Sequence, residues 1–329
     1  MFYNAVTKDA VTENDHVTFW GMDLVNTELY SYVIAASFIV VMILSPILSG
    51  IADGTGSKKM FLRIFCYLGG FSCAALYFFD VNHLEWSMVP LLLSSVGYWG
   101  SIVFYNAYLP EIAPPEEHDK LSARGFSMGY IGSVILLLLN LGMVMGIEQE
   151  AGNTSIIRLC FILVAIWWIG FAQITLNKMP RNPYNKSKGT PWRKGFEELG
   201  KAFRMVKSNP LLKRYLMSFF VFSMAVQTVM LMAQFFGMKE VTQVIDGEVV
   251  TGLTTPQFII AILLIQLIAI PGAYLFSNSS GKYGNVNTLK VALMLWVAVC
   301  LCAFLFVDTP MEFYIAAGWI GFIMGGTQS

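Results

Sequence analysis

The sequence predicts an all-α, polytopic membrane protein, and three observations lead to that prediction. Hydrophobic residues make up 56% of the chain and charged residues only 13%, whereas a soluble domain has roughly 25% charged residues. The apolar residues gather in runs of about twenty, which is the length that crosses the hydrocarbon core of a bilayer as a helix. The Lys and Arg residues fall between these runs, mostly on one alternating side.

Nine apolar runs are long enough to span the membrane. They predict an external, loop-like segment 1–29, an N-terminal bundle of five spans in 30–177, a basic linker 178–213 and a C-terminal bundle of four spans in 214–329. The predicted spans are residues 30–53, 60–80, 86–109, 122–147, 156–176, 214–237, 256–277, 287–307 and 312–328.

The distribution of charge predicts the orientation. If the loop Asp53–Lys59 faces the cytoplasm, 18 of the 21 Lys and Arg residues fall on that side, and 14 of the 21 acidic residues fall on the other. The positive-inside rule therefore places the linker 178–213 in the cytoplasm and segment 1–29 outside. No span or signal peptide precedes that acidic segment, so we expect the chain to be a fragment. The alternative is a complete protein with an odd number of spans and an external N-terminus.

The linker contains a predicted amphipathic helix. Residues 178–214 hold eleven basic residues against two acidic ones. Within Trp192–Lys207, four apolar residues share one helical face, which is typical of a helix on a membrane surface. Two interpretations stay open, regulation through anionic lipid or a solvated basic tether. The four residues are Phe196, Leu199, Phe203 and Val206.

The sequence gives no indication of a nucleic-acid-binding protein, a disulfide-bonded or metal-binding protein, or an enzyme. The net charge is zero, so nothing indicates a nucleic-acid partner. All five cysteines lie inside apolar runs and the three histidines are far apart, so we expect neither disulfides nor a metal site. No catalytic pair or triad is visible, so we expect no enzyme activity and no cofactor.

Uncharged polar residues form stripes on three of the predicted spans. In the third span they recur at spacings of 4, 3 and 4, which is one face of a helix. Polar groups that face lipid are costly, so the stripes face protein or an aqueous cavity. Interhelical hydrogen bonding and substrate binding are both open. The candidate substrate-binding residues are Ser94, Tyr98, Ser101, Tyr105 and Asn106 in the third span, Gln227 and Gln234 in the sixth (with Ser223 on the same stripe), and Gln266 in the seventh.

Two stretches resemble a known family. Ser49–Lys59 is similar to the loop signature of the major facilitator superfamily, with Ala52, Asp53, Gly56, Lys58 and Lys59 matching and the family's loop arginines replaced. Phe104–Ser133 resembles the vacuole effluxer branch, the autophagy-protein-22-like proteins and their bacterial relatives. Gly325-Gly326-x-Gln328-Ser329 resembles the start of a further motif of that branch. The residues that carry the second resemblance are Tyr105, Asn106, Leu109, Pro110, Glu111, Ser122, Arg124, Gly125, Gly129, Tyr130 and Gly132.

The resemblance implies the major facilitator fold, with twelve helices in two six-helix bundles that rock about a central site. On that mapping the nine spans correspond to family helices two to ten. Asp53 would latch the bundles on the cytoplasmic side, with Gly56, Lys58 and Lys59 in the same motif.

Four residues near the third and fourth spans complete the candidate set. Glu111 and Arg124 would form a charge pair across the short loop between those spans. Gly125 and Gly129, with Gly132, share a helical face on which a neighbouring helix could approach closely.

The function implied by the resemblance is secondary transport of a small organic solute, conceivably an amino acid, by alternating access in a bacterial plasma membrane. The alternative is a non-transporting scaffold or receptor. The expected partners are the solute and the lipid bilayer, with possible proton or ion coupling. No acidic residue lies in the middle of a span, so the sequence assigns no coupling group.

Overall fold

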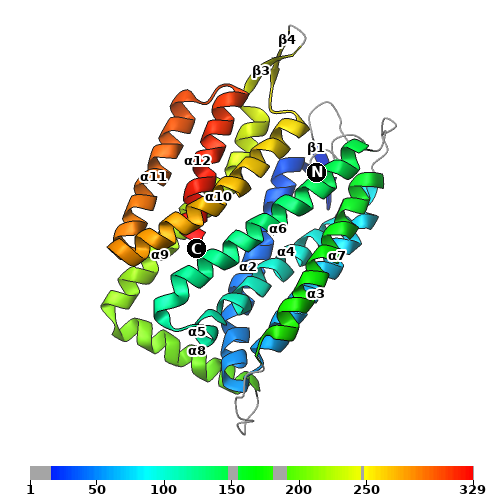
Figure 1. Ribbon diagram of the computed structural model, residues 1–329. Coiled ribbons are helices and arrows are strands. Elements are labelled where there is room, and N and C mark those ends of the chain that lie inside the picture. Colours follow the sequence, from blue (N-terminus) through cyan, green and yellow to red (C-terminus); the bar gives the residue numbers. More distant parts are fainter. Residues whose placement is uncertain (1–15, 147–154, 181–190, 246–247, 329) are drawn as a thin grey trace. The chain divides into compact units, whose positions relative to one another are not determined.

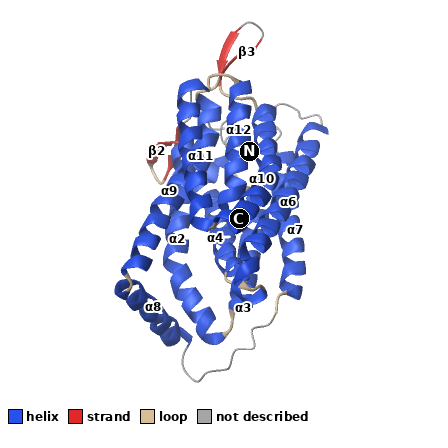
Figure 2. Cartoon of the chain, turned by 60° about the vertical axis from the view of Figure 1, so that its left-hand side comes forward, coloured by secondary structure: helices blue, strands red, loops and turns tan. Residues whose placement is uncertain are grey.

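The computed structural model describes residues 16–146, 155–180, 191–245 and 248–328, which form long helices with two short hairpins (Figures 1 and 2). In chain order the elements are β1 (His16–Phe19), β2 (Met22–Val25), α2 (Asn26–Thr55), α3 (Lys58–Ala75), α4 (Leu84–Asn106), α5 (Leu109–Ile112), α6 (His118–Gly146), α7 (Ser155–Lys178), α8 (Pro191–Ser208), α9 (Pro210–Lys239), β3 (Thr242–Ile245), β4 (Glu248–Thr251), α10 (Thr255–Tyr283), α11 (Asn285–Phe306) and α12 (Pro310–Gln328). Single 3-10 turns lie at Leu76–Phe78, Val81–His83 and Pro115–Glu117.

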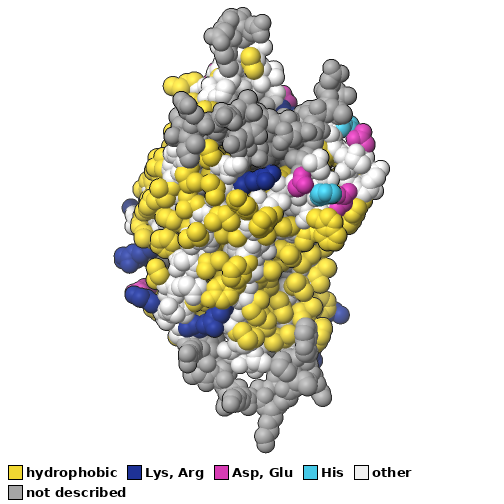
Figure 3. All heavy atoms as spheres, turned by 90° about the vertical axis from the view of Figure 1, so that its right-hand side faces the viewer, with side chains coloured by type: hydrophobic (Ala, Val, Ile, Leu, Met, Phe, Trp, Pro, Cys, Tyr) yellow, Lys and Arg dark blue, Asp and Glu magenta, His cyan; other side chains and the backbone are white. Residues whose placement is uncertain are grey.

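Eight helices among the described residues are long and apolar enough to cross a membrane, and they match the first eight predicted spans. The ninth predicted run forms α12, but this helix is not among the eight. Helix α12 carries Glu312 in its first turn and contains four glycines. The predicted all-α polytopic class is confirmed. Figure 3 shows that hydrophobic side chains cover much of the described surface of one face, as expected for helices that meet lipid.

Residue choice explains where several helices begin and end. Gly56 has a φ of 68°, the left-handed conformation that favours glycine, and it ends α2 before α3 begins. Gly284 lies between α10 and α11 with a φ of 84° and a ψ of 148°, a different conformation that also favours glycine. Asn209 caps α9, because its side-chain oxygen accepts hydrogen bonds of 3.1 Å from the backbone N–H groups of Leu211 and Leu212.

The helices form two compact units. Unit one contains the residues up to Tyr108 together with Leu139–Ser208, and unit two contains Leu109–Leu138 together with the residues from Asn209 onward. Helix α6 therefore contributes to both units. The division into bundles at 30–177 and 214–329 stays a prediction.

Close contacts through glycine build the core of unit one. Helix α3 packs against both α4 and α7. A Cβ on Gly97 of α4 would collide with the backbone of Gly69 on α3, and a Cβ on Gly100 would collide with the ring of Phe65. The backbones of α3 and α4 lie too close together for larger residues at these positions. The buried residues around this contact are Ala52, Leu62, Phe65, Cys66, Val96, Phe104, Tyr108 and Leu176.

Unit two is organised around the contact between α10 and α12. The carbonyl oxygen of Ile265 lies 2.5 Å from the place where a Cβ would stand on Gly321, and the backbone of Ala269 lies even closer to that place on Gly325. Small residues thus bring these two helices together. Side chains from α6, α9 and α11 complete the core, whose buried members are Tyr130, Val226, Ala269, Phe276, Ala292, Trp296, Val299, Ile323 and Met324.

Two antiparallel hairpins were not predicted. Strands β1 and β2 pair His16 with Val25 through Phe19 with Met22, and the ring of His16 lies 3.0 Å from the carboxylate of Asp23. Strands β3 and β4 form a second hairpin between α9 and α10. Strands of four residues are too short for their alternation to be recognised in the sequence.

Candidate functional site

The polar stripe of α4 belongs to unit one, and its two serines bond to their own helix. The hydroxyl of Ser94 donates to the carbonyl oxygen of Leu91 at 2.9 Å, and that of Ser101 donates to the carbonyl oxygen of Tyr98 at 2.7 Å. Each serine therefore uses its one hydrogen-bond donor within α4 and offers a solute only its acceptor lone pairs.

The aromatic residues of the same stripe are more exposed. The side chain of Tyr98 is 49% exposed, and its ring lies edge-on to Trp168 of α7 with 6.1 Å between ring centroids. Tyr105 and Asn106 are also exposed at the last turn of α4. In unit one, the groups available to a solute are therefore the two tyrosines and the amide of Asn106.

The polar stripe of α9 belongs to unit two. Ser223, Gln227, Met230 and Gln234 recur at spacings of 4, 3 and 4, so they share one face of the helix. Gln227 is exposed and Gln234 is half-buried. Neither amide has a hydrogen-bond partner among the described residues, so both remain able to bind another molecule.

A hydrogen-bonded pair lies beside the α9 stripe. The hydroxyl of Tyr130 on α6 donates to the side-chain oxygen of Gln328 on α12 at 2.9 Å. The amide nitrogen of Gln328 donates to the sulfur of Met230 on α9 at 3.7 Å. Because Met230 lies between Gln227 and Gln234 on the stripe, this chain of contacts brings α6, α12 and the polar face of α9 together within unit two.

Sequence reasoning did not include Tyr130 or Gln328 among the site residues. Both residues lie in stretches that carry the family resemblance, and this resemblance was the signal that could have identified them as site residues. Tyr130 and Gln328 are separated by almost two hundred positions, and helical spacing on one segment gives no information about such a pair. Only the tertiary arrangement of unit two brings them together.

Gln266 is the polar residue of α10. Its side-chain oxygen is buried and has no hydrogen-bond partner among the described residues. A buried amide oxygen without a donor is costly, typically about 1–3 kcal/mol. The residue is therefore a candidate for contact with a solute or water, and its predicted role stays a prediction.

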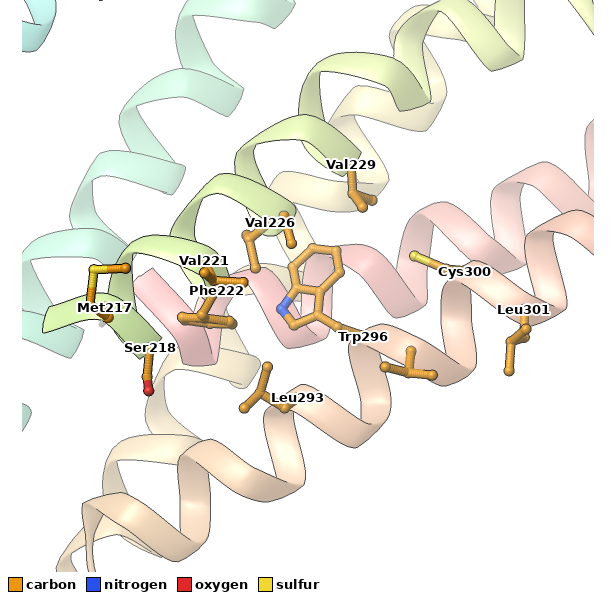
Figure 4. Close-up of a pocket in the computed structure, with 12 residues that line it drawn as sticks. Met217, Ser218, Val221, Phe222, Val226, Val229, Leu293, Trp296, Cys300 and Leu301 are labelled. Carbon is orange, nitrogen blue, oxygen red and sulfur yellow. The ribbon is translucent and has the colours of Figure 1, made fainter. Parts of the chain in front are cut away.

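A pocket of about 730 Å³ lies between α9 and α11 in unit two, on the face of α9 opposite the polar stripe (Figure 4). Its lining is almost entirely apolar, and the indole of Trp296 reaches into it. The indole nitrogen has no hydrogen-bond partner among the described residues. Such a lining favours contact with apolar groups and does not favour recognition of a polar solute. The residues that line it are Met217, Ser218, Val221, Phe222, Ala225, Val226, Val229, Leu293, Trp296, Val297, Cys300 and Leu301.

The charged residues at the end of α2 and the start of α3 interact within unit one. The ammonium of Lys58 lies 3.0 Å from the carboxylate of Asp53. The ammonium of Lys59 donates to the carbonyl oxygen of Met179, just beyond the end of α7, at 2.8 Å. Lys58 compensates the negative charge at the C-terminal end of α2, and Lys59 caps α7. A latch between bundles through Asp53 stays a prediction.

The other motif residues have mixed outcomes. Glu111 lies in α5 and Arg124 is exposed in α6; their pairing stays a prediction. The close helix approach expected at Gly129 and Gly132 is not seen among the described residues and stays a prediction. No atom of the described residues comes within 4 Å of where a Cβ would stand on either glycine. The small-residue contacts lie instead between α3 and α4 and between α10 and α12. The prediction for Gly125 stays open.

The described parts of the chain contain no group of three or more His, Cys, Asp or Glu side chains that could hold a metal ion. The candidate groups around Tyr130 and Gln328 are hydroxyls, amides and a thioether, all uncharged. The eight membrane-length helices among the described residues define a multi-pass membrane protein.

The chain belongs to the family described as vacuole effluxer Atg22 like, whose family model matches residues 5–118 and 113–329. It is 26% identical over 307 residues to an uncharacterized MFS-type transporter, YxiO, of Bacillus subtilis (strain 168). That alignment covers 92% of this chain and 69% of the Bacillus protein. The family is one of membrane transporters of the major facilitator type rather than of enzymes, which confirms the resemblance seen in the sequence.

A second relative is autophagy-related protein 22-1 of Penicillium rubens (strain ATCC 28089 / DSM 1075 / NRRL 1951 / Wisconsin 54-1255), 21% identical over 401 residues. The alignment covers 95% of this chain and 65% of the fungal protein. The chain thus spans about two thirds of the length of these two relatives. No solved structure matches the chain.

Proposed function

We propose that the protein carries a small, polar organic solute without net charge across the membrane by alternating access. The observation that supports this most is the Tyr130–Gln328 hydrogen bond beside the amide stripe of α9. Polar groups at membrane depth are costly and are retained where they pair with one another or meet a polar cavity.

The depth of the pair supports a site within the membrane. Tyr130 lies twelve residues after His118, the first residue of α6, which corresponds to about 18 Å of helix. Gln328 lies eighteen residues after Pro310, the first residue of α12, or about 27 Å. Tyr130 is therefore well inside α6, and Gln328, the last residue of α12, lies at the same level because the two side chains are hydrogen-bonded.

The chemistry of the site favours a solute with both donors and acceptors. Each glutamine amide offers two N–H donors and one acceptor oxygen, and a tyrosine hydroxyl can do both. No charged side chain belongs to the α9 stripe, so a net charge on the solute would be uncompensated. Neutral amino acids are the first class to test. The predicted residues Gln227 and Gln234 are the leading contacts on α9, and Tyr98 and Tyr105 are the leading contacts on α4.

The remaining parts of the proposal follow from the charge pattern and the relatives. The linker 178–213 would face the cytoplasm and the protein would lie in a bacterial plasma membrane. Proton or ion coupling would require a titratable group at membrane depth, and none of the predicted spans carries an acidic residue in its middle.

A thermal-shift screen of the purified protein tests the proposal. A bound solute raises the unfolding temperature by mass action, by RT ln(1 + [L]/Kd) in free energy. We expect stabilisation by neutral polar solutes such as amino acids, and its loss in Gln234→Leu. Thr228→Val is the control, since the Thr228 hydroxyl bonds only to the carbonyl oxygen of Met224 on its own helix. Stabilisation only by charged solutes, or equally strong stabilisation of Gln234→Leu, would contradict the proposed site.

A further inference from the structure

Helix α8 crosses α2 at a pair of glycines in unit one. A Cβ on Gly50 of α2 would stand 2.6 Å from the carbonyl oxygen of Gly195 on α8. In the other direction, a Cβ on Gly195 would stand 2.6 Å from the side chain of Ile51 and 3.2 Å from the carbonyl oxygen of Ile47. The two backbones therefore touch, and the crossing leaves no space for a side chain on either glycine.

The crossing fixes the level of α8 relative to a membrane span. Gly50 lies five residues before Thr55, the last residue of α2, which corresponds to about 7.5 Å along the helix. Helix α2 is one of the eight helices long and apolar enough to cross the membrane. Its end lies where hydrocarbon gives way to lipid headgroups, so α8 lies against α2 at that boundary.

The apolar face of α8 has two edges with different surroundings. Gly195 at one edge meets α2, and Leu199 and Val206 beside it are half-buried. At the other edge, Phe196 is 56% exposed and Phe203 is 69% exposed. These two rings are seven residues apart, which is two helical turns, so they point in nearly the same direction. The described residues leave this aromatic edge uncovered.

Basic side chains accompany the aromatic edge. Helix α8 contains five Lys and Arg residues against two Glu residues. Arg204 and Lys207 are exposed, and Lys207 follows Phe203 by one helical turn, so it lies on the same side. An apolar edge with adjoining cations, held at headgroup level, is complementary to the surface of an anionic leaflet. A protein partner would have to bind at the same narrow boundary between the membrane span and the headgroups. This location favours lipid over protein as the partner of the aromatic edge.

We propose that α8 is a membrane-surface helix: Phe196 and Phe203 insert at the boundary between headgroups and acyl chains, and Arg204 and Lys207 bind anionic lipid headgroups. The Gly50–Gly195 crossing holds the helix at the depth where this contact forms. The inference is independent of the transported solute, because it concerns unit one and the bilayer alone.

Spin labels in proteoliposomes test the insertion directly. In a background with the five cysteines replaced, a single cysteine at position 203 or at position 201 carries the label. The two positions lie on nearly opposite sides of α8. With phosphatidylglycerol present, we expect label 203 to be accessible to oxygen and protected from a water-soluble nickel chelate, and label 201 to show the reverse. Equal accessibility at both positions would overturn the proposal. So would protection of label 203 from both reagents, which would indicate that protein covers the edge.

Two sets of variants separate the lipid contact from the fold of the helix. Arg204→Gln with Lys207→Gln should lower the ratio of inserted to free label by about fivefold for each charge removed, and pure phosphatidylcholine should have a similar effect. Gly195→Ala should displace α8 and expose label 203 to the nickel chelate. Gly200→Ala is the matched control, since no described atom lies within 4 Å of its Cβ position. Insertion that is independent of anionic lipid and of both basic residues would refute the headgroup contact.

Discussion

The hydroxyl of Tyr130 donates a 2.9 Å hydrogen bond to the side-chain oxygen of Gln328, and through it α6 is bonded to the last turn of α12. Gln328 uses the other end of its amide for the sulfur of Met230 on α9. One glutamine therefore contacts two helices that are distant from it in sequence. These side chains form the centre of the site that we propose, and they give the first prediction.

Tyr130→Phe removes the hydroxyl and leaves the oxygen of Gln328 without its donor. We expect the free energy of unfolding to fall by about 1 kcal/mol, the usual cost of losing one partner of a buried hydrogen bond, and solute binding to weaken. Thermal unfolding and ligand binding would be measured together. Tyr274→Phe is the control in the same unit, because Tyr274 is exposed and has no hydrogen bond among the described residues. Equal effects of the two variants would remove Tyr130 from the site.

The amides of α9 should affect binding more than stability. Gln227→Leu makes the stripe apolar without removing a hydrogen bond to a described residue, so the unfolding temperature should change little. The affinity for the solute should fall by about tenfold, which corresponds to the loss of about 1.4 kcal/mol. Solute titration of the purified variant provides the measurement. If Gln227→Leu binds like the unchanged protein while Tyr130→Phe does not, the solute contacts α6 and α12 but not this part of α9.

The glycines of α12 should be far less tolerant of substitution than those of α6. Gly321→Ala introduces a methyl group 2.5 Å from the carbonyl oxygen of Ile265, and overpacking of this kind costs about 1–3 kcal/mol. Gly129→Ala meets no described atom within 4 Å, and the better helix propensity of Ala should stabilise the helix by up to about 1 kcal/mol. Thermal unfolding of both variants provides the comparison. Equal destabilisation would mean that α6 is packed at Gly129 after all.

The two lysines that begin α3 should contribute through different partners. Lys59→Met removes the hydrogen bond to the carbonyl oxygen of Met179, and we expect a loss of about 1 kcal/mol of stability that depends little on salt. Lys58→Met removes an ion pair with Asp53, whose side chain is 56% exposed, and such pairs contribute at most about 1 kcal/mol and weaken as salt rises. Unfolding at low and high ionic strength distinguishes them. A strong salt dependence for Lys59→Met would contradict its role as a cap.

The sequence predicted the membrane spans well, because each span is a long apolar run whose signal is local. It also predicted a helix at Trp192–Lys207, where apolar residues follow the helical period and where α8 forms. At Gly129 the expected close contact is not seen among the described residues. Glycines at helical spacing permit close approach, but whether a neighbour comes close depends on the partner helix.

The candidate site was predicted only in its local parts. Periodicity indicated that Gln227 and Gln234 share a face of α9, and the spacing of Met230 on that face agrees with it. Periodicity could not indicate that Gln328 would bond to Met230 and Tyr130, because hydrogen bonds between distant segments depend on tertiary packing. In the same way, Ser94 and Ser101 looked like free polar groups, whereas they bond to carbonyl oxygens of their own helix.

Solute counterflow in proteoliposomes tests the central claim most directly. Vesicles loaded with the unlabelled neutral amino acid that gives the largest thermal shift would be diluted into buffer with the labelled solute. We predict transient accumulation of label by the unchanged protein and a loss of at least tenfold in the initial rate for Tyr130→Phe combined with Gln227→Leu. Absence of accumulation for a solute that binds and stabilises the protein would contradict transport and would favour a receptor.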